Sequence, residues 1–76
     1  MKILVVDDDE SLSSIITTAL EKEGFTSFSA KTGRDALNKA KSDNPDFILL
    51  DQVLPDISGN EVLKQLKLDD QTKNIP

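Results

Sequence analysis

The sequence contains no cysteine and no histidine. Without cysteine the chain can form neither a disulfide nor a thiolate site. Without histidine it lacks the commonest general base and metal ligand of proteins. No apolar run approaches the roughly 20 residues that a membrane-spanning helix needs. These absences leave oxygen-bearing side chains as the main candidates for a metal site.

Basic residues are also scarce. Lysine and arginine total 9 against 14 aspartates and glutamates, so the 76 residues carry a net charge of −5. Contact with nucleic acid needs clustered basic side chains, so we expect this segment to bind no nucleic acid, and we expect no membrane contact. Residues 1–6 are too short, and too soon followed by acids, for a signal peptide, which predicts a cytoplasmic protein. The length allows one small domain at most, or part of one.

Apolar runs predict three strands. Residues 3–6 and 47–50 are continuous apolar runs, each followed by an acid, and are typical of strands buried on both faces of a parallel sheet. Residues 25–30 form a weaker candidate strand. The segments between these runs change to helical spacing.

The first predicted helix carries an apolar stripe that we assign to the core, and Gly24 ends it. The stripe consists of Leu12, Ile15, Ile16, Ala19 and Leu20.

Capping signals predict two more helices. Thr32 starts the second, which ends before Pro45, and Ser58 with Glu61 forms a capping box for the third. The apolar face of the third helix comprises Val62, Leu63 and Leu66.

The predicted order is βαβαβα, which implies an α/β fold with parallel pairing and right-handed crossovers. Both outer strands need a central neighbour. We therefore expect the doubly wound, flavodoxin-like order 2-1-3, although the sequence does not itself establish it. In that order strands 1 and 3 are adjacent, and ligands bind beyond their carboxyl ends.

Carboxylates follow both of these strands. Asp7 and Asp8 come after the first and Asp51 after the third, so the 2-1-3 order would place all of them in one crevice. Three carboxylates so close repel one another unless one is protonated or a cation binds. Oxygen-only ligands favour a hard cation such as Mg²⁺. Taken singly, each aspartate is more simply explained as a loop residue or helix cap, the role we expect for Asp9, but the two clusters together favour a site.

Two segments resemble the receiver domain of response regulators. Residues 2–9, KILVVDDD, are similar to its opening, and residues 46–59, DFILLDQVLPDISG, to the segment around its acceptor aspartate. The resemblance to this CheY-like family covers essentially the whole chain. It implies a phosphoprotein of two-component signalling that receives its phosphoryl group from a histidine kinase or phosphotransfer protein, and that is not an enzyme beyond promoting its own phosphorylation and dephosphorylation.

The resemblance also implies roles for individual residues. Asp51 would accept the phosphoryl group and bind Mg²⁺. Asp8 would bind the metal directly, Asp7 through a water, and Val53 through its backbone carbonyl. Pro55 and Gly59 would shape the loop into the third helix. Gln52 departs from the family, which tends to be apolar beside the acceptor.

The family has five βα units, and residues 1–76 supply three, so we expect a partial receiver domain truncated before the fourth strand. The family's Ser/Thr and Lys, which follow the fourth and fifth strands, have no counterpart here, because Thr72 and Lys73 lie in the wrong segment. The third strand would form an apolar edge, which favours pairing with another chain or self-association.

Three alternatives stay open. A receiver-like fragment could act only as a protein-association module. Asp7 and Asp9, followed by Glu10 and Ser11, also fit the D-x-D-x-[T/S] pattern of haloacid-dehalogenase-like phosphotransferases, although the match around Asp51 would then go unexplained. Flavin binding ranks lowest, because a row of carboxylates would repel the phosphate of FMN.

Overall fold

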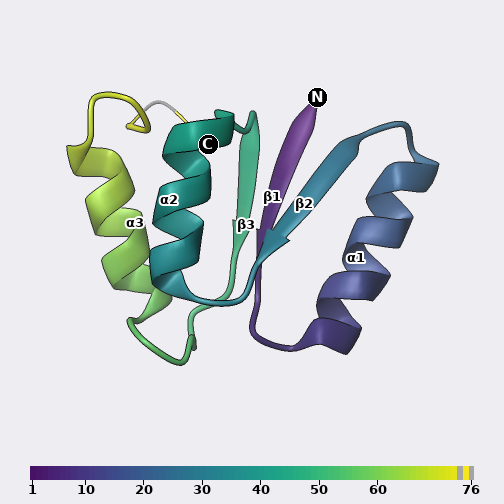
Figure 1. The fold of residues 1–76 in the computed structure, drawn as a ribbon, viewed down its shortest axis with the longest axis horizontal. Helices are drawn as coiled ribbons and strands as arrows, with labels where there is room; N and C mark the ends of the chain where they lie inside the picture. The colour runs from purple at the N-terminus through teal and green to yellow at the C-terminus, as the bar shows by residue number, and fades with distance from the viewer. Residues whose placement is uncertain (74, 76) are drawn as a thin grey trace.

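Strands and helices alternate along the chain in a computed structural model that describes residues 1–73 and 75 (Figure 1). The elements are β1 (Lys2–Val6), α1 (Glu10–Lys22), β2 (Thr26–Ala30), α2 (Gly33–Asp43), β3 (Phe47–Leu50) and α3 (Gly59–Leu68). This order confirms the predicted βαβαβα pattern. No helix within the described residues is long and apolar enough to cross a membrane.

The sheet has the order β2-β1-β3, and both pairings are parallel. The predicted flavodoxin-like arrangement, with the first strand in the centre, is confirmed. In the register Val6 of β1 lies beside Leu50 of β3. The carboxyl ends of these two strands therefore lie next to each other at one edge of the sheet.

The main hydrophobic core lies between the sheet and the pair of helices α2 and α3, which cover the same face (Figure 1). Leu4 and Val6 of β1 point into it and are buried. Ala36 and Ala40 of α2 are also buried, and their small side chains let the helix lie close to the strands. The remaining buried members of this core are Ala30, Val62 and Leu66.

Within the described residues α1 is the one helix on the opposite face (Figure 1), and its predicted core stripe is wrong in part. Ile16 and Leu20 are half-buried, but Leu12 and Ile15 are 45% and 67% exposed and Ala19 is exposed as well. The helix turns the flank that contains the buried Ser13 toward the sheet. Leu12 and Ile15 lie outside that flank, and the described residues place no second helix beside α1 to cover them.

Strand β3 is half-covered, in line with its position at the edge of the sheet. Ile48 and Leu50 pack against the α2 and α3 core, whereas Phe47 and Leu49 are 41% and 45% exposed on the α1 side. Leu63, predicted to be in the core, is 46% exposed, whereas Val62 and Leu66 of the same helix are buried.

The predicted helix starts are confirmed by their hydrogen bonds. The Thr32 hydroxyl accepts a hydrogen bond from the Asp35 N–H at 3.0 Å, and the Ser58 hydroxyl accepts one from the Glu61 N–H at 3.2 Å. Asn44, with a φ of 48°, ends α2 in the left-handed conformation that commonly closes helices.

We predict that Leu4→Ala destabilises the chain by about 2–5 kcal/mol, since the side chain is fully buried and its truncation leaves a cavity. Leu68→Ala is the matched control. Because Leu68 is 74% exposed, its truncation should change stability by only about 0.5 kcal/mol. Urea unfolding followed by circular dichroism gives both values, and equal effects of the two substitutions would contradict the location of the core.

Candidate metal and phosphoryl site

The backbone of both strand ends is held in place by the sheet. The Asp7 N–H donates to the Ala30 carbonyl of β2 at 3.0 Å, and the Asp51 N–H donates to the Val6 carbonyl of β1 at 3.0 Å. Each aspartate is thus anchored by a neighbouring strand immediately before the chain turns into a loop. This anchoring fixes the positions from which the two side chains project.

Three carboxylates meet at this edge. One oxygen each from Asp7, Asp8 and Asp51 lies within 4.8 Å of the other two. Asp7 is only 9% exposed, Asp51 is partly buried and Asp8 is exposed. The structure therefore brings together the three carboxylates that the sequence placed in one crevice, while their chemical roles stay predictions.

Asp9, the last of the three consecutive aspartates, has a different role. Its carboxylate accepts hydrogen bonds from the N–H groups of Ser11 at 3.0 Å and Leu12 at 3.2 Å, so it caps α1. Its own N–H donates to the Asp7 carboxylate at 3.0 Å, which orients that side chain. Because its carboxylate caps α1, Asp9 is a poor candidate for an acid/base group.

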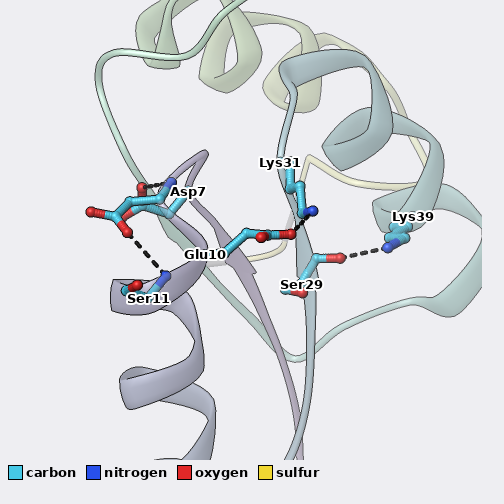
Figure 2. Close-up of polar contacts among 7 residues, drawn as sticks. Asp7, Glu10, Ser11, Ser29, Lys31 and Lys39 are labelled. Carbon is cyan, nitrogen blue, oxygen red and sulfur yellow. Dashed lines mark hydrogen bonds and ion pairs between the residues drawn. The ribbon is translucent and has the colours of Figure 1, made fainter.

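An ion pair links the start of α1 to the residue that follows β2. Figure 2 shows Glu10, the first residue of α1, paired with Lys31, which follows β2. Both side chains are well exposed, so the pair contributes little stability. The Lys31 ammonium is paired with Glu10 and leaves the negative charge of the carboxylate cluster to be balanced by another cation.

The donor set fits Mg²⁺. The three clustered ligand atoms are carboxylate oxygens, which hard cations prefer, and they lie close enough to share one ion. Mg²⁺ is usually held by one or two carboxylates together with waters and phosphate oxygens, so a cluster with one exposed and two more buried acids is suitable.

The loop after β3 returns tightly to α3. The Gly59 N–H donates to the Gln52 carbonyl at 3.0 Å. A Cβ at Gly59 would overlap the Asp51 carbonyl oxygen, so only glycine allows this close approach. The predicted role of Gly59 in shaping the loop thus has a steric basis. Val53, in the middle of the loop, exposes 77% of its surface, and any contact with a metal would come from its backbone.

Asp56 is a site-loop residue that sequence reasoning missed. Its carboxylate accepts hydrogen bonds from the backbone N–H groups of Gly33 and Arg34 at the start of α2. The N–H of Arg34, followed by that of Gly33, holds the pKa of Asp56 below its usual value. No local signal could have revealed this cap, because it joins residues more than 20 positions apart.

A mainly apolar groove of about 350 Å³ lies beside the carboxylates. It is lined by residues of β1 and β3, by Ile16 of α1, and by Asp7 and Asp51. The site is therefore bordered by apolar surface on the α1 side.

Comparisons with known proteins agree with this geometry. The family described as "Response regulator receiver domain" matches residues 3–76. The alkaline phosphatase synthesis transcriptional regulatory protein PhoP of Bacillus subtilis is 47% identical over 66 residues, which are 87% of this chain and 28% of PhoP.

Solved structures lead to the same family. The N-terminal domain of a response regulator receiver protein from Methanoculleus marisnigri superposes with a TM-score of 0.96 at 35% identity, over 99% of this chain and 61% of that one. Response regulator TrrA of Thermotoga maritima, solved in complex with Mg²⁺ and BeF, gives a TM-score of 0.87 at 36% identity, over 92% of this chain and 61% of that one.

The chain thus spans 28% of PhoP and 61% of both structural relatives. The family match, by contrast, takes in nearly all of the chain, and the fold and the acidic strand ends agree with it. This chain belongs to the response regulator receiver domain family of two-component signalling.

Proposed function

We propose that this chain is a phosphoryl acceptor that is modified on Asp51 in a Mg²⁺-dependent reaction. The observation that carries the proposal is the meeting of the Asp7, Asp8 and Asp51 carboxylates within 4.8 Å at the carboxyl ends of β1 and β3. The structure of the Thermotoga relative in complex with Mg²⁺ and BeF supports this proposal. The proposed donor is a phosphohistidine of a histidine kinase or phosphotransfer protein, met in the cytoplasm.

The chemistry follows from the groups at the site. A carboxylate oxygen of Asp51 attacks the phosphorus, the new O–P bond forms, and the N–P bond of the donor breaks. The leaving histidine nitrogen keeps the electron pair and takes up a proton from solvent. A bound Mg²⁺ would neutralise charge on the transferring group. Asp8 and Asp51 would hold the ion directly, with Asp7 acting through a water and Val53 through its carbonyl.

Asp51 is well placed for this role. Its N–H is bonded to Val6, so its backbone cannot drift as the side chain reacts. Asp7 is nearly buried and held by the Asp9 N–H, which suits it to orient a ligand rather than to leave the site. Because Asp7 is restrained in this way, Asp51 is the better candidate for the nucleophile in the cluster.

A second candidate function, association through β3, rests on a separate observation. Within the described residues β3 pairs with β1 alone, so its other side is an edge. The Asp51 N–H points to β1, and N–H groups alternate along a strand, so those of Ile48 and Leu50 point outward. Phe47 and Leu49 expose apolar surface beside them. An antiparallel pair centred on Ile48 would place Phe47 against Leu49 of a second copy.

We predict that acetyl phosphate with Mg²⁺ adds one phosphoryl group to the parent chain, as measured by intact mass. Asp51→Asn should show no adduct, because it lacks the nucleophilic carboxylate, and EDTA should abolish the adduct on the parent. Asp46→Asn, an exposed acid at the opposite end of β3, is the matched control and should be modified like the parent. An unmodified parent chain that is folded would overturn the proposal.

We predict that the parent chain self-associates as its concentration rises and that Leu49→Lys weakens this association. A lysine on an exposed edge opposes strand pairing. Sedimentation velocity measures the effect, and Lys64→Ala on the exposed surface of α3 is the control. A parent chain that stays monomeric throughout would refute self-association through the β3 edge.

A further inference from the structure

The loop between β3 and α3 is tied to the start of α2 by one side chain. The two carboxylate oxygens of Asp56 each accept one hydrogen bond, from the Gly33 N–H at 2.7 Å and from the Arg34 N–H at 2.9 Å. These lengths are typical of charge-assisted hydrogen bonds. The contact crosses from one βα unit to the next.

The hydrogen bonds of α2 show why a distant residue is needed there. The first N–H groups of a helix have no partner within it. The side-chain hydroxyl of Thr32 accepts the N–H of Asp35, the third residue of α2. Asp56 accepts the first two, and its negative charge also suits the positive end of the helix dipole. The cap of α2 is thus completed by the loop that leads from the site.

Packing holds the loop at the next residue as well. A Cβ at Gly33 would overlap the side chain of Ile57, so Ile57 lies directly against the backbone of α2. At the far end Gly59 is bonded to Gln52 and touches the Asp51 carbonyl. The intervening residues 53–55 are therefore held between two fixed points.

We propose that Asp56 is a positioning residue, which fixes the β3–α3 loop so that the backbone of residues 51–53 keeps the orientation that the metal site requires. The effect of Asp56 on metal binding rests on the proposed function, whereas its effect on the conformation of the loop does not. Asp56 is not one of the three clustered carboxylates. Asp56 acts indirectly. Its hydrogen bonds to α2 hold the loop, and the loop in turn fixes the Asp51 and Val53 carbonyls.

The two ends of this path are linked energetically. If order at the start of α2 favours metal binding, metal binding favours that order by the same factor. Mg²⁺ should therefore shift the amide signals of Gly33 and Arg34, although both lie on α2 and not in the carboxylate cluster. The lowered pKa of Asp56 means that its carboxylate is ionised at neutral pH, where the cap is needed.

The test compares Asp56→Ala with Thr32→Ala in ¹⁵N-labelled chains. Both substitutions remove a cap from α2, but only Asp56 joins the helix to the loop. One readout, without metal, is hydrogen exchange of the Gly59 amide, which is bonded within the loop. The other is Mg²⁺ affinity, read from the amide shifts of residues 7–9. Asp56→Asn, which keeps one acceptor oxygen, tests for partial rescue.

We predict that Asp56→Ala accelerates exchange at Gly59 and weakens Mg²⁺ binding, each by about tenfold, as loss of the hydrogen bonds to a charged group implies. Thr32→Ala should change both by less than about threefold, and Asp56→Asn should fall between them. Unchanged exchange at Gly59 in Asp56→Ala would overturn the inference.

Two further outcomes separate the parts of the account. Faster exchange at Gly59 with Mg²⁺ affinity equal to that of the parent would overturn the link from the loop to the metal. Faster exchange in a chain whose parent form binds no Mg²⁺ would overturn the proposed function, while still supporting Asp56 as the residue that holds the loop.

Discussion

Parallel pairing of β1 with β3 is the interaction on which the site depends. It sets Val6 beside Leu50, and both strands are followed at once by aspartates. The same register lets the Asp51 N–H bond to Val6, so the pairing continues to the residue that projects into the cluster. A shift of one residue would turn the Leu50 side chain from the core to the opposite face and displace the carboxylate. The burial of β1 on both faces opposes such a shift.

Placing three carboxylates together at one edge of the sheet is unfavourable unless the surrounding structure stabilises their positions. Here the backbone at both strand ends is bonded to neighbouring strands, and the Asp9 N–H binds the Asp7 carboxylate. The loop beyond Asp51 is restrained at Asp56 and Gly59. A cluster whose members are fixed before a cation arrives needs little rearrangement to bind it, which lowers the cost of ordering the site. The same restraints make the site depend on residues that never touch the ligand.

Periodicity and capping residues predicted most of the fold because they act locally. The apolar runs located β1 and β3, a weaker pattern over residues 25–30 located β2, and Thr32 and Ser58 located two helix starts to the residue. The exposed side of α1 could not be predicted, because the spacing of Leu12 and Ile15 shows that a helix is amphipathic but not which neighbours cover it. Asp56 was missed for a similar reason. Its partners lie in another βα unit, and only the folded chain brings them together.

The central claim is that the three carboxylates and Mg²⁺ form a site for a phosphoryl group on Asp51. Beryllium fluoride, which mimics that group, tests it without a covalent reaction. A ¹⁹F NMR titration of the chain with beryllium fluoride should show new bound signals that require Mg²⁺ and are absent in Asp51→Asn. Bound signals of equal strength in Asp51→Asn, or none in a folded parent chain that contains Mg²⁺, would contradict the account.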